Sequence, residues 1–419
     1  MRVLVIGSGA REHALVTALR ADESVTSIIC APGNAGIAAD IEVLPVEVSN
    51  PDAVAQLAVD TKADLVVVGP EVPLVAGAAD AIRERGIACF GPSKEAAQLE
   101  GSKAFAKQVM SEANVATAQA HSCATLDEVA KALDEFGEPY VVKDDGLAAG
   151  KGVIVTSDRH QALEHADNCF AQGAPSVLVE EYLDGPEVSL FGITDGVDII
   201  ALQPAQDFKR AHDDDEGPNT GGMGAYSPLP WAPAGLVEEV TASVLQPMVD
   251  AMRRRGTPFV GLLYAGLALT KRGVRIVEFN ARFGDPETQV VLARLKSPLG
   301  QVLLAAATGK VAELAPLEWR EGAAVTVVVA SKNYPDSPVT GDVITGIEEA
   351  NALLDVDVLH AGTRITDEGD VVSAGGRVLS VTAVGDSLAQ ARERAYAGVD
   401  LISLAGSHHR RDIAKRASE

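Results

Sequence analysis

Residues 1–15, MRVLVIGSGAREHAL, begin with a short apolar run that ends at a glycine and is followed by a helical pattern. The same order recurs at residues 63–69 and 87–91, where apolar residues again lead directly into glycine. Continuous apolar runs of this length are typical of strands that are buried on both faces of a parallel sheet. The sequence therefore predicts an N-terminal doubly wound parallel α/β sheet.

The predicted strands end in glycine-rich loops, and ligands of doubly wound sheets bind beyond the carboxyl ends of the strands. The first loop, Gly7-Ser-Gly9, resembles a dinucleotide fingerprint, but Glu12 stands where the third glycine belongs, and Ala31-Pro32 replaces the ribose-binding acid. We interpret the loop as a single-phosphate site at a helix N-terminus, with Arg11 at its rim. The alternative is that its glycines only allow the tight turn from strand to helix.

The composition indicates a globular protein of several domains. A chain of 419 residues has room for about three domains of ~150 residues, and 47% apolar with 22% charged residues is ordinary for a globular protein. The net charge, 35 − 59 = −24, opposes nucleic acid and anionic lipid as main partners. A local loop can still bind a phosphorylated small molecule.

Nothing in the sequence suggests export or membrane insertion. The four cysteines stand far apart without zinc spacing, which favours free thiols in a reducing compartment. The N-terminal apolar run is too short for a signal peptide, and the uncharged stretch 217–237 contains four prolines, which exclude a spanning helix. We expect a cytoplasmic protein with no membrane partner.

A lysine and a second glycine loop predict a nucleotide site in the segment 140–153. Lys143 ends a strand, and the glycines that follow let a backbone approach phosphates closely. The segment is not a Walker A loop, because Gly152 stands where Ser or Thr is required. Lys103 supplies a further cation, and Glu180-Glu181, after the next strand, fits an adenine hinge and a ribose acceptor. The alternative is an exposed hairpin with an acidic edge.

The segment 275–289, RIVEFNARFGDPETQ, carries the sharpest chemistry of the chain. Side chains alternate along a strand, so Glu278, Asn280 and Arg282 are predicted to share one face, while Val277 and the intervening residues face the core. Carboxylate and amide oxygens at this spacing suit Mg²⁺, and Arg282 can stabilise charge on a transferred phosphoryl group. A solvated strand face is the weaker alternative, because three polar groups lead straight into Gly-Asp-Pro-Glu.

A third group of polar residues lies in the segment 206–224. Gln206-Asp-Phe-Lys-Arg210 precedes an acidic run and the glycine turn Gly221–Gly224, which we interpret as an anion-binding nest. The acidic run by itself is more typical of a solvated face. None of the eight histidines belongs to a cluster with ligand spacing, and we assign none of them to catalysis.

The motifs follow one another as GSGAREHAL, APGNAGI, VGPEVPLV, GPSKEAAQLEGSKAF, KDDGLAAGKGV, QDFKR, GPNTGGMGAYSP, EFNARFGDPETQ and HAGT with GGRVL. Together they closely resemble the phosphoribosylamine–glycine ligase (glycinamide ribonucleotide synthetase) family of the ATP-grasp superfamily, nearly from end to end. The chain stops after one such unit, which implies a monofunctional enzyme. In one departure, the family's phosphate loop begins Lys-Ala-Asp-Gly, whereas Asp144 follows Lys143 here, and strand alternation predicts that Asp144 points away from the phosphates.

The resemblance implies a role for each motif. Its metal ligands, for Mg²⁺ or Mn²⁺, match Glu278 and Asn280, and ATP is the co-substrate. Catalysis and glycine binding are expected at Asp207, Arg282 and Asp285. The ATP site matches Lys103, Lys143, Gly146, Gly150, Lys151, Gly152, Glu180, Glu181, Tyr182, Leu183 and Glu187. The phosphoribosylamine pocket matches Gly9, Arg11, Glu12, Asn34, Gly69, Glu71, Thr220, Gly221, Gly222 and Gly224.

The implied architecture is α/β and α+β, with several domains. An N-terminal substrate-binding domain covers residues 1–100, and an ATP-grasp domain covers 101–320 with a small lid at about 115–187. A mixed α/β domain covers 321–419. We expect a monomer that binds small molecules and no nucleic acid, and a transient contact with the enzyme that supplies phosphoribosylamine stays open.

The implied reaction activates glycine with ATP as glycyl phosphate. The amine of phosphoribosylamine then displaces phosphate and gives glycinamide ribonucleotide for purine (IMP) synthesis. Two alternatives stay open: another ATP-grasp ligase, such as a carboxylase that acts on bicarbonate, and a nucleotide-binding sensor without turnover. The presence of Lys143, Glu278, Asn280 and Arg282 argues against the sensor, which has no need of all four residues.

Overall fold

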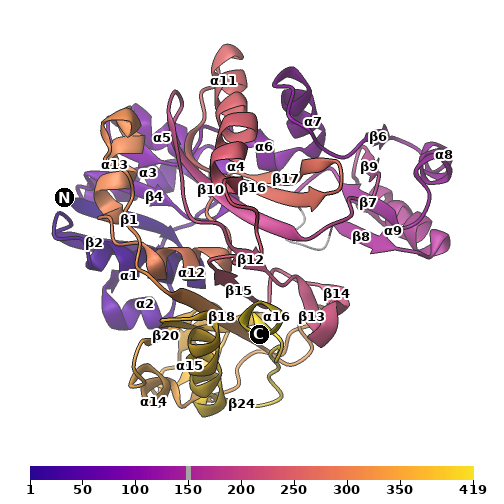
Figure 1. Ribbon diagram of the computed structural model, residues 1–419. Coiled ribbons are helices and arrows are strands. Elements are labelled where there is room, and N and C mark those ends of the chain that lie inside the picture. Colours follow the sequence, from indigo (N-terminus) through magenta and orange to yellow (C-terminus); the bar gives the residue numbers. More distant parts are fainter. Residues whose placement is uncertain (148–151) are drawn as a thin grey trace.

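The computed structural model describes residues 1–147 and 152–419. Its N-terminal part is a parallel sheet with the strand order β3-β2-β1-β4-β5 and helices on both faces (Figure 1). The strands are β1 (Arg2–Gly7), β2 (Ser27–Pro32), β3 (Glu42–Val43), β4 (Leu65–Val68) and β5 (Ala88–Phe90). The helices are α1 (Ala10–Arg20), α2 (Ala35–Asp40), α3 (Pro51–Asp60), α4 (Glu71–Ala76) and α5 (Ala78–Glu84).

Both faces of this sheet are buried. Leu4 and Ile6 of β1 belong to one hydrophobic core, and Val3 and Val5 belong to another, because successive side chains point to opposite faces. The observed sheet confirms the predicted doubly wound fold. Its strand ends therefore lie at one edge, where the glycine loops follow them.

Two helices lead from this sheet to a small separate layer, which is on the right in Figure 1. The two helices are separate because Ser102 between them is extended, and its hydroxyl caps the second helix at Phe105 N–H. The layer is an antiparallel sheet in the order β6-β9-β7-β8, covered by two helices with their own hydrophobic core. These elements are α6 (Gln98–Gly101), α7 (Lys103–Glu112), β6 (Ala120–Cys123), α8 (Leu126–Phe136), β7 (Tyr140–Asp144), β8 (Val153–Thr156), α9 (Arg159–Ala171) and β9 (Val177–Glu180).

A central antiparallel sheet has the strand order β11-β10-β16-β17. One face packs against α10 and α11, and apolar residues of both helices join apolar residues of β16 and β17 in one core. The opposite face carries the polar residues that are described below. The elements are β10 (Glu187–Asp195), β11 (Ile199–Ala201), α10 (Leu236–Val240), α11 (Gln246–Arg254), β16 (Val260–Thr270) and β17 (Gly273–Asn280), with a π-helical turn at Thr241–Leu245.

The last sheet combines distant segments in the order β12-β15-β18-β23-β20. Its first two strands come from the middle of the chain, so this middle segment and the C-terminal residues form one layer, at the bottom of Figure 1. The strands are β12 (Gln206–Asp207), β15 (Gly224–Ser227), β18 (Ala323–Ala330), β20 (Val356–His360) and β23 (Arg377–Gly385). The neighbouring helices are α12 (Glu287–Arg294), α13 (Leu299–Ala307), α14 (Ile347–Asn351), α15 (Leu388–Leu401) and α16 (Lys415–Ser418).

Three two-stranded sheets complete the part of the chain that the structure describes. Two are hairpins, β13 (Arg210–His212) with β14 (Glu216–Asn219) and β21 (Thr363–Ile365) with β22 (Val371–Ser373), and the third pairs β19 (Ile344–Thr345) with the distant β24 (Ser403–Leu404). The four cysteines are buried free thiols, and burial raises the pKa of Cys89 to about 12. Among the described residues, no helix is long and apolar enough to cross a membrane.

Candidate active site

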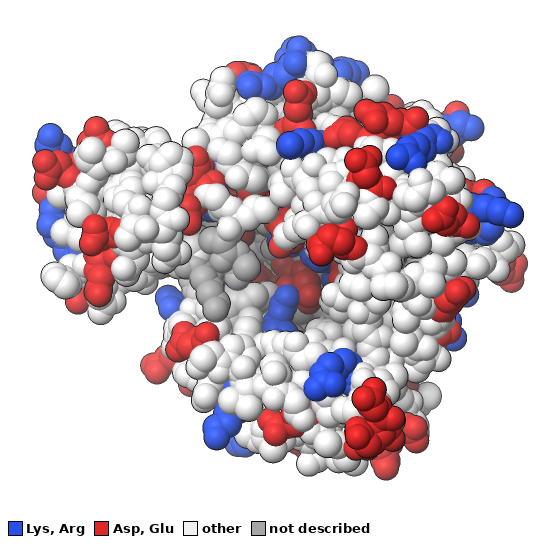
Figure 2. All heavy atoms as spheres, turned by 180° about the vertical axis from the view of Figure 1, so that it is seen from behind, with Lys and Arg blue, Asp and Glu red and all other residues white. Residues whose placement is uncertain are grey.

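A hollow separates the lobes of the molecule, and acidic and basic side chains gather at its floor (Figure 2). Contacts between distant segments bring the charged residues together. Lys143 of the small sheet reaches β17, Arg282 beyond β17 reaches the N-terminal domain, and Lys209 after β12 reaches β10. The sites that were predicted separately therefore adjoin one another.

The two predicted metal ligands, Glu278 and Asn280, lie on β17. Glu278 pairs with Gly266 of β16, and Asn280 pairs with Tyr264, so both side chains project from the face opposite the core. Within the described residues, neither side chain has a hydrogen-bond partner in the protein. Gly266, opposite Glu278, has no side chain. A Cβ at Gly266 would lie 3.4 Å from Glu278 Cγ, which is a close contact without a clash. These two oxygen donors fit a hard divalent ion that takes its remaining ligands from water and phosphates.

A β-bulge at Val277 sets the phase of this strand. Leu267 pairs with Ile276, but its neighbour Gly266 pairs with Glu278, so Val277 has no partner opposite. Ile276 and Phe279 therefore both enter the core, although they are three residues apart. We expected Val277 to face the core as well. Instead it is half-buried at the bulge, and its carbonyl accepts a hydrogen bond from Lys143 Nζ at 3.0 Å.

Lys143 and Lys107 share one buried carboxylate. Lys143 Nζ lies 2.7 Å from Glu180 Oε2, and Lys107 Nζ lies 2.9 Å from Glu180 Oε1. Burial opposes the charge of Lys143, but Glu180 and then Glu278 outweigh it and raise its pKa. Burial likewise opposes ionisation of Glu180, yet the two lysines lower its pKa. Both oxygens of Glu180 are therefore occupied by lysines, which differs from the predicted adenine hinge.

Lys107 was missed in the sequence, although a signal existed: it lies four residues after Lys103 on the same side of α7. Lys103 itself donates from Nζ to Gly146 O at 3.0 Å. Asp145 accepts a hydrogen bond from Ala104 N–H at 2.8 Å, so the start of the glycine loop is attached to the start of α7.

Asp144 forms its hydrogen bond within its own turn. Its Oδ1 accepts from Gly146 N–H at 3.0 Å, and its backbone N–H donates to Gly152 O at 2.7 Å. Its charge helps to raise the pKa of Cys169 on α9, after the larger effect of burial, whereas Lys143 contacts Glu180 and β17. Neighbouring residues thus use opposite faces of β7. Two predicted ATP residues, Gly150 and Lys151, lie outside the described residues.

The segment after β9 was predicted as the rest of the nucleotide hinge. Glu181 accepts hydrogen bonds from Gln119 N–H at 3.1 Å and from Arg272 Nη2 at 2.9 Å. Tyr182 and Leu183 follow without regular structure, and Tyr182 is exposed. Glu187 begins β10 and pairs with Lys209.

Lys209 also approaches Asp207, from Nζ to Oδ1 at 3.3 Å. Burial raises the pKa of Asp207 to about 7; Lys209 opposes this shift, and the charges of Glu287 and Glu187 reinforce it. Asp207 is therefore a carboxyl group that titrates near neutral pH beside the cleft. The sequence pattern did not indicate a role for Lys209.

Arg282 lies beyond the end of β17, so the predicted alternation with Glu278 and Asn280 does not extend to it. Its Nη2 lies 2.8 Å from Glu100 Oε1, and its Nε lies 3.3 Å from Glu71 Oε2. Burial raises the pKa of Glu100. For Glu71, burial is outweighed by the charges of Arg282 and Arg11, and its pKa is lowered.

The first glycine loop differs from the open phosphate site that we expected. Glu12 is buried at 1% exposure, pairs with Arg11, and accepts the Gly9 N–H at 2.6 Å. A Cβ at Gly69 would lie 2.0 Å from Glu12 Oε1, so this glycine makes room for the carboxylate. The third residue of the helix bonds back to the backbone of its cap, which is one half of a capping box, since Gly9 has no side chain that could return a bond. The glutamate itself therefore occupies the donor that we had assigned to phosphate.

Asn34 is likewise used by the protein. Its Oδ1 caps α2 at Ile37 N–H, and its Nδ2 donates to Ser8 O at 2.9 Å and His360 O at 2.7 Å. It therefore ties three segments together, and its amide has no donor left for a substrate.

The turn at Thr220–Gly222 does not form the open anion-binding nest that we expected. Gly221 N–H donates to Tyr334 Oη at 2.9 Å, Gly222 N–H donates to Thr220 Oγ1 at 3.0 Å, and Met223 N–H donates to Phe208 O at 2.7 Å. These donors are all satisfied by the protein. Gly224 is the first residue of β15 and pairs with Val327.

Asp285 lies between two partners that hold both of its oxygens. Gln289 Nε2 donates to Oδ1 at 2.8 Å, and Arg377 Nη2 lies 3.1 Å from Oδ2. Burial opposes its ionisation, but Arg377 and then Arg11 outweigh burial and lower its pKa. Arg377 was not predicted, because it is 92 residues away along the chain and no local pattern connects the two.

A buried triangle of hydroxyls and a carboxylate was also missed. Ser189 and Tyr264 lie 2.8 Å apart, and both contact Glu287 Oε1, at 2.9 and 2.5 Å. Because Tyr264 pairs with Asn280, this triangle supports the strand beside the predicted metal ligands.

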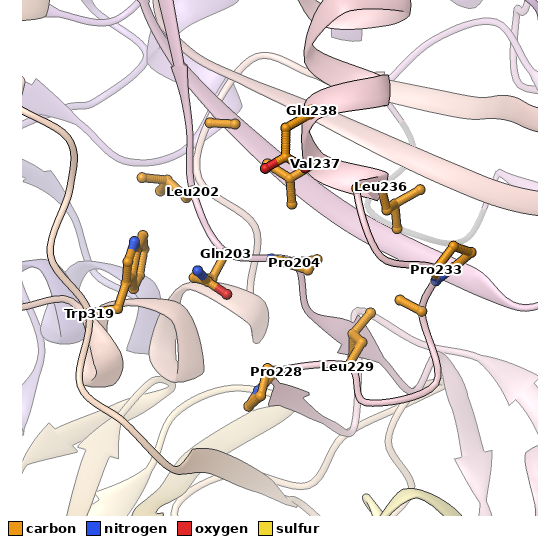
Figure 3. Close-up of a pocket in the computed structure, with 13 residues that line it drawn as sticks. Leu202, Gln203, Pro204, Pro228, Leu229, Pro233, Leu236, Val237, Glu238 and Trp319 are labelled. Atoms are coloured by element: carbon orange, nitrogen blue, oxygen red, sulfur yellow. The ribbon is translucent and has the colours of Figure 1, made fainter.

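A separate pocket of about 260 Å³ lies outside this arrangement (Figure 3). Its walls are mostly apolar, and among the described residues that line it only Glu238 is charged. Such a lining offers no group of charges for phosphoryl transfer. The lining includes Leu202, Gln203, Pro204, Pro228, Leu229, Pro233, Leu236, Val237 and Trp319.

Comparison with known proteins accounts for the whole architecture. Models of the N domain, the ATP-grasp (A) domain and the C domain of phosphoribosylglycinamide synthetase match residues 1–100, 101–288 and 324–416. The Streptomyces coelicolor phosphoribosylamine–glycine ligase is 65% identical over 100% of both chains.

Solved structures agree with this assignment. The crystal structure of phosphoribosylamine–glycine ligase from Thermotoga maritima has a TM-score of 0.84 and 32% identity, over 99% of this chain and 100% of that one. The biotin carboxylase domain of Hydrogenobacter thermophilus 2-oxoglutarate carboxylase shares the fold, with a TM-score of 0.72 and 16% identity over 97% and 91% of the chains. This chain belongs to the phosphoribosylglycinamide synthetase family.

Proposed function

We propose that this chain is a phosphoribosylamine–glycine ligase with its active site in the cleft between β17, the small sheet and the N-terminal strand ends. It joins glycine to 5-phosphoribosylamine and forms glycinamide ribonucleotide, ADP and phosphate in purine synthesis. The observation that carries the activity is the match of all three family domains, in order, together with full-length identity to a curated ligase.

The proposed nucleotide site adjoins the proposed metal site. Lys143 is held between Glu180 and the bulge carbonyl of Val277, next to Glu278. Glu278 and Asn280 would hold Mg²⁺ or Mn²⁺, and such an ion supplies charge neutralisation for the phosphates. Lys103 and the glycine loop at Gly146 are proposed to lie along the phosphates.

The reaction proceeds in two steps. A carboxylate oxygen of glycine attacks the γ-phosphorus of ATP, and the bond from that phosphorus to ADP breaks, which leaves glycyl phosphate. The amine nitrogen of phosphoribosylamine then attacks the acyl carbon, phosphate departs, and the nitrogen loses a proton. We place glycine near Asp207, Arg282 and Asp285, whose supporting contacts hold them at the cleft. Positioning and charge neutralisation are the protein's main contributions.

We place the phosphoribosylamine pocket between the N-terminal loops and the turn at Thr220–Gly224. The contacts of Glu12, Asn34 and Gly69 support roles as walls of this pocket, because their polar groups or space are used by the protein. Arg11 is paired with Glu12, and Glu71 is paired with Arg282, so these charges would line the pocket as ion pairs. The backbone of Thr220–Gly224 would likewise shape the pocket and contribute no free N–H nest.

We propose the domain limits 1–100, 101–320 and 321–419, with residues of about 115–187 as a lid over ATP that keeps water from the acyl phosphate. The separate core of the small sheet supports a lid that moves as a unit. We further propose that the enzyme is a cytoplasmic monomer, with a transient contact to the enzyme that supplies its amine.

ADP release by the purified protein tests this function. ATP and Mg²⁺ are supplied throughout, and glycine and freshly prepared phosphoribosylamine are each omitted in turn. Release that requires both substrates supports the ligase. Release that requires bicarbonate in place of glycine supports a carboxylase, and ATP binding without release supports a sensor; either result contradicts the proposal.

A further inference from the structure

One guanidinium group from the C-terminal domain connects two turns that the sequence places far apart. Arg377 begins β23, and its Nη1 donates to Gly221 O at 2.5 Å, to Asp285 O at 2.8 Å and, at 3.4 Å, to Gly222 O. Its Nη2 lies 3.1 Å from Asp285 Oδ2. The first turn borders the proposed amine pocket, and the second bears the proposed glycine-site residue Asp285.

The same domain also binds the backbone N–H of Gly221. Tyr334 Oη accepts the Gly221 N–H at 2.9 Å. The tyrosine ring packs against Gly376, where a Cβ would lie 2.3 Å from the ring. Tyr334 therefore packs directly beside Arg377, and together these two side chains bind both the donor and the acceptor of Gly221.

The two turns also touch each other, so a shift in one is transmitted to the other. A Cβ on Gly222, whose φ is +111°, would lie 2.4 Å from Pro286 Cδ. A Cβ on Gly9 would lie 3.6 Å from Asp285 Oδ2, so the Asp285 carboxylate faces the first N-terminal loop. Three segments thus meet beside the proposed amine pocket: the turn at Gly221–Gly222, the turn at Asp285–Pro286 and the first N-terminal loop. Arg377 binds the first two.

We propose that Arg377 is a positioning residue for phosphoribosylamine: it fixes the turn at Gly221–Gly222 against Asp285 and thereby sets the shape of the amine pocket. This inference rests on the proposed function. Arginine suits this role, because one rigid guanidinium reaches several carbonyls and a carboxylate at once. A lysine ammonium at the same place cannot span them all.

The test compares Arg377→Met with Arg364→Met, which changes an exposed arginine of β21 in the same domain. Initial rates are measured against phosphoribosylamine at saturating ATP and glycine, and then against ATP at saturating amine and glycine. For Arg377→Met, kcat/KM for phosphoribosylamine should fall on the order of 10²-fold, the cost of misplacing a reactant. KM for ATP should stay within about twofold, and Arg364→Met should match the wild type.

Two further variants keep the inference testable if Arg377→Met fails to fold. Arg377→Lys should recover folding and part of kcat/KM for the amine. Tyr334→Phe removes only the acceptor of Gly221 N–H, so it should raise KM for the amine by a smaller factor and leave KM for ATP unchanged. Losses that are equal for ATP and the amine, or no loss at all in these variants, would overturn the inference. Failure of the wild type itself to require the amine would instead refute the proposed function.

Discussion

Glu180 and Glu278 are carboxylates on two adjoining sheets, and they differ in burial and in hydrogen-bond partners. Glu180 is 3% exposed, and each of its oxygens meets a lysine ammonium. Glu278 is half-buried and has no hydrogen-bond partner among the described residues, although it lies close enough to Lys143 to affect its pKa. The comparison separates a carboxylate that holds the site together from one that is left open for a ligand.

Each of these two states has a physical consequence. A buried ion pair contributes little net stability compared with apolar packing, but removal of one partner leaves an uncompensated charge. An open carboxylate costs little when it is replaced, so its loss should affect chemistry without affecting folding. A change at Glu180 should therefore mainly lower stability, and a change at Glu278 should mainly lower activity.

The largest expected effect is on turnover when Glu278 becomes Gln. Loss of the anionic ligand should lower kcat by about 10³-fold or more with Mg²⁺, because charge on the transferred phosphoryl group is no longer neutralised. The free energy of unfolding should change by less than about 0.5 kcal/mol, since Glu278 has no hydrogen bond to lose among the described residues. ADP release and urea unfolding measure the two quantities, and the exposed Glu349→Gln serves as control. Near-normal turnover would remove Glu278 from the metal site.

The next effect is on stability when Glu180 becomes Ala. Two lysines lose their counter-charge in a buried place, so the free energy of unfolding should fall by about 3–5 kcal/mol in urea titrations. The neighbouring Glu181→Ala is the matched control. Its partner Arg272 is half-exposed, so its loss should cost less than about 1 kcal/mol. Equal losses in the two variants would contradict the distinction drawn here.

The two lysines on Glu180 should differ from each other. Lys143→Ala should lower kcat/KM for ATP by about 10²-fold, because this lysine lies next to β17 and the proposed phosphates. Lys107→Met should mainly lower stability, because Lys107 otherwise bonds to Thr117 and Ala118 O. Steady-state kinetics against ATP and thermal unfolding distinguish the variants. An unchanged KM and kcat for ATP in Lys143→Ala would refute its assignment.

The smallest expected effect is a pH dependence of stability, caused by the buried side chain of His360. Burial lowers the pKa of His360 to about 4 from its ordinary 6.5, with His13 adding to the shift and Asp40 opposing it. Between these values the unfolded chain binds the proton more readily, so stability is present above about pH 6.5 and declines as pH falls toward 4. The expected loss is about 2 kcal/mol by the time pH has fallen to about 5. Urea titrations of the wild type and His360→Gln measure it, and an equal slope in both would assign the effect to other groups.

Much of the fold and part of the site were predictable from local patterns. The apolar runs that end in glycine predicted the parallel sheet, and strand alternation predicted that Glu278 and Asn280 project together from one face. The Gly9-x-x-Glu12 spacing also contained the glutamate half of a capping box, although we interpreted this loop as a phosphate site. Such signals act over a few residues, where the backbone geometry is set by the residues themselves.

Other features depended on partners that are far away in sequence. Glu180 as a lysine anchor, Arg377 as a link between turns, and the filled turn at Gly221 all require groups from separate elements. The bulge at Val277 changes which residues of β17 enter the core, and its position emerges only from pairing with β16. No periodicity in the chain encodes these contacts.

By itself, the sequence determined the chemistry that the protein carries: the doubly wound N-terminal sheet, the order of the family's motifs, and an acid and an amide on one strand face. The tertiary structure alone decided which of those polar groups are open. Glu12, Asn34 and Glu180 are satisfied by neighbours, whereas Glu278 and Asn280 have no hydrogen-bond partner in the part of the chain that the structure describes. The physical reason is that a residue's type and spacing are local, but the occupancy of its hydrogen bonds depends on what the folded chain brings beside it.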